Sequence, residues 1–358
     1  MVGIMIPLFK PYMPEELDQI DDILYSGALA YGKWGRRFEE ALQSFIGNKL
    51  TMVVNSYNSA MLVTLATFDI RAGDEVIASP MSCLASNQPM AALGIKVKWV
   101  DIDPHTGTID PIDLQGKITS NTKAIIHNHH CGYPGHIEEV LSIANSEGVY
   151  LIDDAIEAFG SEYKGHKIGS LKSDATVYSF QTVRFPNAID GGGISFREKD
   201  KFEKARRIRD WGVDRSTFRD EYGEISAKSD VDLVGYGATP NEINSYIGFL
   251  QMKKATEIIE KQKENHELWE EKIANKHSNL VSINKDFHTP NGWVFGCLSE
   301  NKMESILKFR ELGYYASGVH LPNNNYSVFG SSEELKGVND FHSRFLALPC
   351  GWWIEEII

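Results

Sequence analysis

The stretch "LIDDAIEAFG", residues 151–160, is the most informative part of the sequence. It begins with apolar residues, as a strand buried in a sheet does, and two adjacent carboxylates, Asp153 and Asp154, follow directly. A further acid, Glu157, comes three residues after Asp154. One interpretation of these acids is a solvent-exposed helix cap. The other is that an acid at the carboxyl end of a buried strand pairs with the protonated ring nitrogen of a cofactor.

Short apolar runs alternate with helical patterns on both sides of that stretch, from about residue 50 to residue 200. Residues 59–70 and 136–148, for example, have the spacing of helices. Strands that alternate with helices form a mainly parallel sheet covered on both faces, so the sequence predicts an α/β fold. Ligands of such sheets bind beyond the carboxyl ends of the strands. The seven predicted strands are 50–55, 74–79, 96–103, 123–130, 149–154, 175–180 and 192–196.

The pattern changes after about residue 240. One long helix is predicted over residues 241–275, and shorter, mixed helices and strands follow it. We therefore predict a large α/β domain over residues 1–240, with an N-terminal arm, and a smaller α+β domain over residues 241–358.

Charge and hydropathy exclude several classes of function. The 358 residues carry a formal net charge of −13, so a nucleic acid or an anionic membrane surface would be repelled. Basic residues do cluster at 201–212, but their helical spacing and acidic neighbours favour a solvated helix face. No apolar run approaches the roughly 20 residues that span a bilayer. Since the apolar N-terminus also lacks a basic leader, we expect a cytoplasmic protein.

Two further segments follow predicted strands. "NSYNSA", residues 55–60, opens a helix with small polar residues, and backbone N–H groups at a helix N-terminus bind phosphate, although such residues also serve as ordinary caps. "DATVYSF", residues 174–180, carries Ser179 near its end. The turn at 190–193 contains three glycines, which permit close approach of the backbone.

In combination, these segments resemble the DegT/DnrJ/StrS family of sugar aminotransferases, and the resemblance covers nearly the whole chain. It is carried by the opening segment, a Gly-Asp-Glu-Val-Ile segment, an Asp-rich segment, the acid motif with its continuation, and two C-terminal segments. These are "SGALAYGKWGRRFEE" (26–40), "AGDEVIASPMSCLAS" (72–86), "VDIDPHTGTIDP" (100–111), "DDAIEAFGSEYKGHKIG" (153–169), "GFLQMKK" (248–254) and "LALPCGWW" (346–353).

The resemblance implies a pyridoxal-phosphate (PLP) enzyme of fold type I, with a mainly parallel seven-stranded sheet and a smaller C-terminal α+β domain. It implies a homodimer, because the family builds each active site from two chains, and a nucleotide-linked keto sugar as substrate. Asp154 takes the position of the acid that pairs with the pyridine nitrogen, and Glu157 takes the usual Gln/Glu position. The implied cofactor-binding residues are Ser56, Tyr57, Asn58, Cys83, Asp154, Glu157 and Ser179, and His320 lies where the family contacts substrate.

The sequence departs from the family at the residue that carries the chemistry. Counting from Ser179 and Phe180, the position of the lysine that binds PLP covalently holds Arg184. A guanidinium, with a pKa of about 12.5 or more, stays protonated and does not attack an aldehyde, whereas Schiff-base chemistry needs a free amine. Arg184 could bind a phosphate or carboxylate instead, or lie on the surface of a loop that has lost its function.

Other departures weaken the implied cofactor site. The Ser-Gly-Thr phosphate cradle of the family reads Ser56-Tyr57-Asn58, and a Thr-aromatic pair whose ring stacks on the coenzyme reads Ser82-Cys83. A partner-contacting Asn-aromatic-Arg segment reads "GAT" at 237–239. Any PLP, or its amino form pyridoxamine phosphate (PMP), is therefore expected to bind without a covalent link.

No metal site is expected. In "HNHHCG" (127–132), His127 and His129 can share a face, but no further ligand pattern accompanies them, and His129 coincides with a histidine of the family. The cysteines lie without CxxC spacing, which indicates neither a disulfide framework nor a zinc ribbon.

Three functions stay open at the level of the sequence. The chain could carry out family chemistry in some form on a nucleotide-linked keto sugar of polysaccharide or deoxysugar biosynthesis, although ordinary transamination needs the missing lysine. It could be a PMP-dependent sugar dehydratase, although relatives of that type carry histidine at the lysine position, a base at neutral pH where arginine is not. It could also be a non-catalytic or cofactor-free protein that binds a nucleotide sugar or pairs with an active paralogue.

Overall fold

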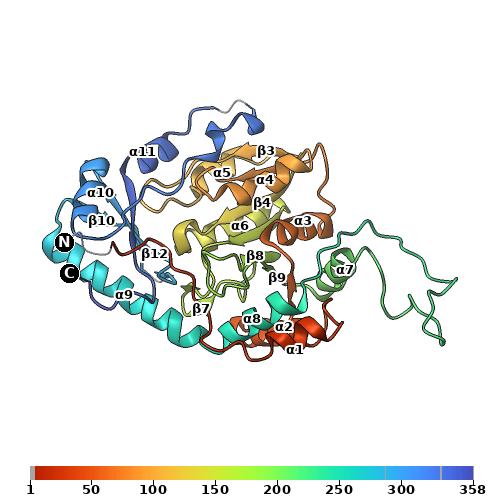
Figure 1. The fold of residues 1–358 in the computed structure, drawn as a ribbon. Coiled ribbons are helices and arrows are strands. Elements are labelled where there is room, and N and C mark those ends of the chain that lie inside the picture. Colours follow the sequence, from red (N-terminus) through yellow and green to blue (C-terminus); the bar gives the residue numbers. More distant parts are fainter. Residues whose placement is uncertain (1–4, 287, 331–332, 358) are drawn as a thin grey trace.

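The computed structural model describes residues 5–286, 288–330 and 333–357. A seven-stranded sheet of order β1-β9-β8-β5-β4-β2-β3 forms its centre (Figure 1). The sheet is parallel except for β9, which is antiparallel to both of its neighbours. All seven predicted strands are confirmed: β1 Thr51–Val54, β2 Glu75–Ala78, β3 Lys96–Trp99, β4 Thr122–Asn128, β5 Tyr150–Ala155, β8 Ala175–Ser179 and β9 Gly192–Phe196.

Helices cover both faces of this sheet, because its strands bury side chains on both faces. On one face Ile126 and Ile152 pack in a core with helices α3, α4 and α7. On the other face Ile125 and Leu151 pack against α5 and α6, and α2 covers the neighbouring strands. The helices are α2 Lys33–Ile46, α3 Tyr57–Thr67, α4 Leu84–Ala92, α5 Pro111–Lys117, α6 Ile137–Glu147 and α7 Lys199–Arg209.

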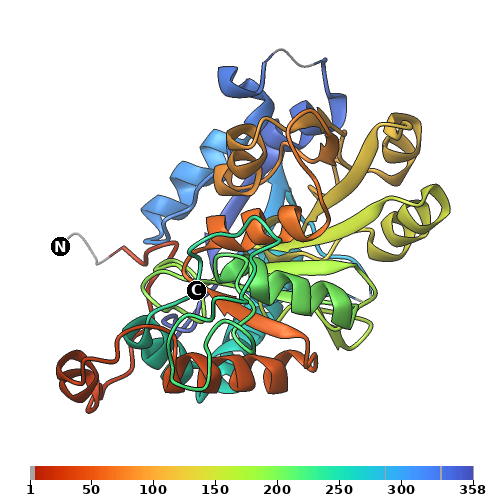
Figure 2. The ribbon, with the colours of Figure 1, turned by 90° about the vertical axis from the view of Figure 1, so that its right-hand side faces the viewer.

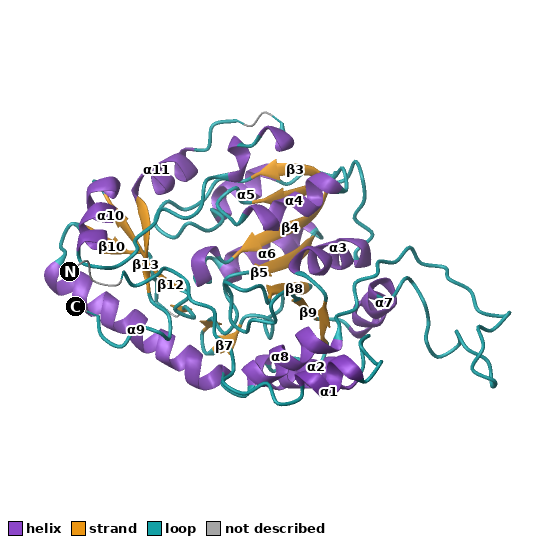
Figure 3. Ribbon diagram, in the orientation of Figure 1, coloured by secondary structure: helices purple, strands orange, loops and turns teal. Residues whose placement is uncertain are grey.

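A second, three-stranded sheet of order β10-β12-β13 lies to one side of the central sheet (Figure 3). It packs with helices α9 and α10 around Trp269 and Phe295, so the predicted C-terminal α+β region is present. The boundary at residues 240 and 241 stays a prediction. The elements are β10 Leu280–Ser282, β12 Val294–Ser299, β13 Phe345–Pro349, α9 Ala255–Lys276, α10 Lys302–Glu311 and α11 Lys336–Arg344.

The remaining elements are short. A small sheet pairs β11 with β6 and β6 with β7. These short elements are helix α1 Ile20–Tyr25, strands β6 Glu162–Tyr163, β7 His166–Lys167 and β11 His288–Thr289, and 3₁₀ helices His130–Gly132, Asn323–Asn325 and Ser327–Phe329. None of the helices described has both the length and the apolar character that crossing a membrane requires.

The prediction of one continuous helix over residues 241–275 was wrong. The chain forms two helices, α8 Glu242–Met252 and α9, which are separated by a turn at Lys253 and Lys254. The turn lets the two helices pack against different partners: Tyr246 of α8 contacts Trp34 of α2, while Trp269 of α9 packs against the second sheet. Helical periodicity in the sequence continues through such a turn, so it did not reveal the break.

The basic segment at 201–212 is also less solvated than predicted. Arg209, the last residue of α7, is only 4% exposed. Its guanidinium donates to the carboxylate of Glu39 at 2.6 Å and to the backbone carbonyl of Val53 at 2.7 Å, so it ties α7 to α2 and β1. The segment that follows, at about 213–236, extends away from the body of the molecule on the right of Figure 1, the side that faces the viewer in Figure 2.

Glu242 holds the start of α2 from the first turn of α8. Its buried carboxylate accepts hydrogen bonds from the backbone N–H groups of Gly32, Trp34 and Gly35, at 2.9 to 3.1 Å. These N–H groups have no partner within the helix, and an anion at a helix N-terminus is favoured by the helix dipole. One carboxylate therefore fixes the packing of α8 against α2.

We predict that Glu242→Gln lowers the free energy of unfolding by about 2 kcal/mol, since charge-assisted hydrogen bonds contribute roughly 1.5–3 kcal/mol. Urea denaturation followed by circular dichroism measures the change. The control is Glu271→Gln on the exposed side of α9, which is expected to leave the midpoint unchanged. Equal midpoints for the two variants would contradict the capping role.

Candidate active site

The candidate site lies at the carboxyl ends of β5 and β8. Asp153 and Asp154 are both inside β5 and almost fully buried, which excludes the interpretation as a solvent-exposed helix cap. Adjacent strand residues point to opposite faces, so only Asp154 faces helix α3. Ser179 ends β8, and the loop after it carries Arg184.

Asp154 already has hydrogen-bond partners on both carboxylate oxygens. The Tyr57 hydroxyl donates to Oδ1 at 2.7 Å, and the Asn128 side-chain amide donates to Oδ2 at 2.7 Å. The backbone N–H of Ile156 also donates to Oδ1, at 3.1 Å. Burial raises the pKa of Asp154, and the surrounding hydrogen bonds offset part of that rise. The protein itself thus supplies the donors that this carboxylate needs.

Tyr57 reaches Asp154 because of its place at the start of α3. Ser56 is the N-cap of that helix, and its side-chain oxygen accepts from the backbone N–H of Ser59 at 3.0 Å. The Tyr57 ring is fully buried, and burial, together with the nearby Asp154, raises the pKa of its hydroxyl well above the ordinary value, so it remains a donor. Asn58 is exposed. Two residues of the predicted phosphate cradle thus have other contacts within the protein. The Tyr57 side chain points to the Asp154 carboxylate, and Ser56 caps helix α3.

Arg184, His320 and Glu157 form a second charged group beside Asp154. The Glu157 carboxylate lies 2.7 Å from His320 Nε2 and 3.3 Å from a terminal nitrogen of Arg184. Burial alone would raise the pKa of Glu157, but His320 and Arg184 outweigh it and lower that pKa to about 2. The guanidinium also lies 4.3 Å from the centre of the Trp293 ring, a cation–π contact.

Arg184 is thus not a surface residue of a degenerate loop, because its side chain is only 6% exposed. It binds a carboxylate, as one interpretation of the sequence expected, but this carboxylate belongs to the protein itself. His320 lies at the site, as predicted, where it contacts Glu157. Cys83 is half-buried at the start of α4, and burial and the charge of Glu157 raise the pKa of its thiol.

A small cavity lies beside Arg184 and Glu157. It has a volume of about 20 Å³ and is lined by residues that include Ser179, Glu157 and Arg184. A cavity needs about 10–15 Å³ to hold one water molecule, so this space holds roughly one. No lysine is among the residues that line it. Two lysines upstream of β8 lie elsewhere: Lys164 pairs with Glu138, and Lys167 lies 4.9 Å from the Phe45 ring.

A model of the DegT/DnrJ/EryC1/StrS aminotransferase family matches residues 12–354. The chain belongs to this family. The resemblance seen in the sequence is therefore confirmed, and the fold agrees with it. AtS13 from Actinomadura melliaura, of known crystal structure, superposes on the chain with a TM-score of 0.92 at 28% identity, over 99% of this chain and 96% of that one.

Two relatives indicate the kind of pathway in which the family works. The UDP-4-amino-4,6-dideoxy-N-acetyl-β-L-altrosamine transaminase of Helicobacter pylori is 26% identical over 355 residues, 94% of this chain and 90% of the relative. The spore coat polysaccharide biosynthesis protein SpsC of Bacillus subtilis is 28% identical over 261 residues, 72% of this chain and 67% of the relative. The family thus includes sugar aminotransferases and proteins of polysaccharide biosynthesis.

A protein of the same fold has been solved with each form of the coenzyme that the sequence resemblance implies. Spr1654 from Streptococcus pneumoniae, which superposes with a TM-score of 0.87 at 19% identity over 98% of this chain and 95% of that chain, has been solved in both a PLP form and a PMP form.

The residues present in this chain do not fit that coenzyme. The Tyr57 hydroxyl already donates to Asp154, the acid that would pair with a pyridine nitrogen, and Arg184 stands where the family resemblance implies the lysine that would hold the coenzyme.

Sequence reasoning did not find three contributors to the site. Tyr57 was identified only as a residue of the phosphate cradle, although a bulky aromatic in place of a glycine was a signal that space had been filled. Asn128 ends β4 between His127 and His129, and its pairing with Asp154 on β5 puts the two side chains on the same face of the sheet. Trp293 lies more than 100 residues from Arg184 in the chain, and no local pattern connects the two.

We predict that Glu157→Gln destabilises the fold by about 3–5 kcal/mol, the usual result of leaving a buried charge without its partner. Arg184 keeps its charge in this variant, so the double variant Arg184→Met/Glu157→Gln should recover much of the loss. A double-mutant cycle tests this. Urea denaturation measures the free energy of unfolding of Glu157→Gln, of Arg184→Met and of the double variant.

The matched control is Glu138→Gln, which removes the exposed ion pair with Lys164. It is expected to leave the urea midpoint close to that of the original protein. If Glu157→Gln costs no more than this control, the contact between Arg184 and Glu157 does not form in solution.

Proposed function

We propose that this chain is a coenzyme-free member of the sugar aminotransferase family, which binds a nucleotide-linked sugar and does not transfer its amino group. One observation carries the proposal: the Tyr57 hydroxyl hydrogen bonds to Asp154, and both residues are fully buried. The hydroxyl supplies the same kind of donor as a protonated pyridine nitrogen. Binding of PLP at this place would have to break that bond and move a fully buried ring.

Arg184 supports the same proposal independently. Its ion pair with Glu157 and its contact with Trp293 give the guanidinium a structural role within the protein. Because a guanidinium stays protonated near neutral pH, it provides neither the amine for a covalent link nor a base for proton transfer. Both enzymatic alternatives, transamination and PMP-dependent dehydration, need the coenzyme and are therefore less well supported.

The substrate class rests on the relatives. We propose a nucleotide-linked sugar of polysaccharide or deoxysugar biosynthesis, bound in the cytoplasm by a homodimer. A concavity of about 780 Å³ between α7 and Tyr31 has the size of a ligand site. Four arginines line it, namely Arg206, Arg207, Arg209 and Arg215, and guanidinium groups suit a diphosphate. A diphosphate would compete there with the carboxylates that these arginines already pair with.

The first test adds PLP to the original protein and to the double variant Tyr57→Gly/Arg184→Lys. The original protein should give no absorbance band of a Schiff base, no lysine labelled after borohydride, and no PLP-dependent rise in melting temperature. The double variant should gain all three, because the space, the free carboxylate and the amine are restored. Tyr222→Gly/Arg71→Lys, at two exposed positions, is the matched control.

A saturable Schiff-base band in the original protein would overturn the coenzyme-free proposal. Because Tyr57→Gly removes a large buried side chain, at a cost of about 3–5 kcal/mol, folding of the double variant is checked by circular dichroism. Should it not fold, the PLP titration of the original protein still decides the question.

The second test measures binding of a nucleotide sugar. UDP-N-acetylglucosamine is expected to raise the melting temperature of the original protein in proportion to the logarithm of its concentration above the dissociation constant. Free N-acetylglucosamine, which lacks the diphosphate, is the control and should give no shift. Equal shifts in melting temperature with both compounds, or no shift with either, would contradict the proposed substrate class. Neither result would bear on the proposal that the protein binds no coenzyme.

A further inference from the structure

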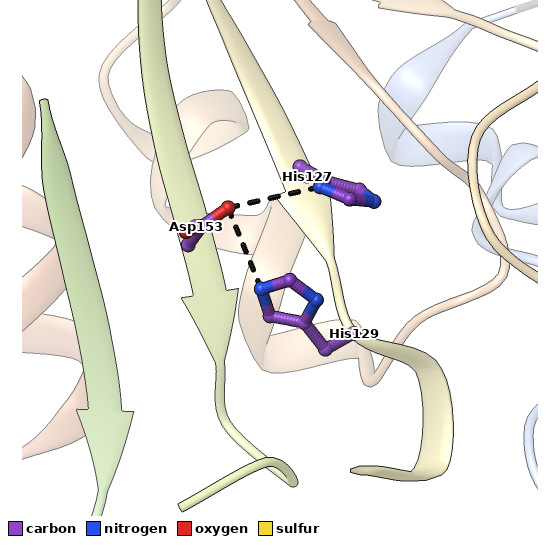
Figure 4. A group of neighbouring side chains, drawn as sticks. All are labelled: His127, His129 and Asp153. Atoms are coloured by element: carbon purple, nitrogen blue, oxygen red, sulfur yellow. Dashed lines mark ion pairs between the residues drawn. The ribbon is translucent and has the colours of Figure 1, made fainter. Parts of the chain in front are cut away.

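Three buried side chains face one another on the side of the sheet away from Tyr57. His127 and His129 come from β4 and the residue after its end, and Asp153 comes from the neighbouring strand β5 (Figure 4). Strand pairing places His127 directly opposite Asp153. The potential donor atoms of the three residues lie within 4.8 Å of one another, and none of the residues is more than 1% exposed.

The hydrogen bonds of His129 define which of its nitrogens carries a proton. Nδ1 lies 2.7 Å from the backbone carbonyl oxygen of Pro134. Since a carbonyl oxygen only accepts, Nδ1 must be the donor, and in a neutral ring Nε2 then presents a lone pair. That lone pair faces Asp153 Oδ1 at 3.4 Å, so two acceptors point at each other.

The other atoms of this group also lack partners. His127 Nδ1 lies 3.7 Å from Asp153 Oδ1. Five side-chain atoms have no hydrogen-bond partner among the described residues. They are both ring nitrogens of His127, both carboxylate oxygens of Asp153 and Nε2 of His129. A buried carboxylate is unfavourable unless a positive charge pairs with it, and here that charge is either a protonated imidazole or a cation bound between the three residues.

A divalent transition metal matches these donors. Two imidazole nitrogens and one carboxylate oxygen are ligands of Zn²⁺, at bonds of about 2.0–2.2 Å. In a tetrahedron with such bonds, neighbouring ligand atoms are roughly 3.3 Å apart. The observed separations of 3.4 and 3.7 Å are close to that edge. The hydrogen bond from His129 Nδ1 to Pro134 is of the kind that orients a ligating histidine.

We propose that His127, His129 and Asp153 supply three ligands to one Zn²⁺ bound between β4 and β5. The ion neutralises Asp153 and ties two central strands together on the face opposite the Asp154 pocket. Sequence spacing could not predict this site, because the third ligand comes from another strand. The proposal does not depend on the proposed function. A second group of possible ligands, His130, Cys131 and Glu157, belongs to the candidate active site, where Glu157 already has partners.

The experiment measures metal content by mass spectrometry, and then the melting temperature of chelator-treated protein with and without added ZnCl₂. We expect one zinc per chain in the original protein and a rise in melting temperature on return of zinc. Asp153→Asn and His127→Asn should reduce the zinc to background and abolish the rise. His266→Gln, at a histidine buried in a different core, is the matched control and should keep one zinc per chain.

Absence of zinc, together with no saturable one-to-one titration of the apoprotein by ZnCl₂, would overturn the proposal. In that case nitrogen NMR should find both nitrogens of His129 protonated, with an imidazolium paired to Asp153 in place of the ion. Retention of zinc by Asp153→Asn would equally overturn it. If the variants do not fold, the titration of the original apoprotein, repeated with Co²⁺ and its visible spectrum, still decides the outcome.

Discussion

The alternation of side chains along β5 is the constraint on which both halves of the molecule's chemistry depend. Asp153 and Asp154 are adjacent and almost fully buried, so the strand must send one carboxylate to each face of the sheet. Each carboxylate then needs its own partners, because both are shielded from the bulk solvent. Asp154 finds a tyrosine and an amide on one face. Asp153 faces two histidines on the other.

On the first face, the chain keeps the scaffold of its family and changes what the scaffold holds. The sheet, the acid at the end of β5 and the capped helix α3 are all in place. Tyr57 fills the space next to the acid with an aromatic ring that donates a hydrogen bond, as a protonated pyridine does. Arg184, at the position where the family resemblance implies a reactive lysine, carries a permanent charge that Glu157 neutralises. Both residues fit the proposed coenzyme-free function, since a pocket without coenzyme has no need of an amine.

Much of this could be predicted from the sequence. The seven strands of the central sheet were found because each is a short apolar run followed by polar residues, and the family was recognised from motifs along the whole chain. The break between α8 and α9 was missed, since helical periodicity carries through Lys253 and Lys254. The role of Tyr57 was missed as well, because its identity is visible in the sequence but the direction of its side chain is not. Contacts between distant segments, such as Arg184 with Trp293, follow only from the packed structure.

A crystal structure of the protein grown with excess PLP tests the central claim most directly. The account predicts density for the Tyr57 ring with its hydroxyl at hydrogen-bond distance from Asp154, near the 2.7 Å found here, and no coenzyme density beside it. A coenzyme ring bound to Asp154, with Tyr57 turned out of the pocket, would contradict it.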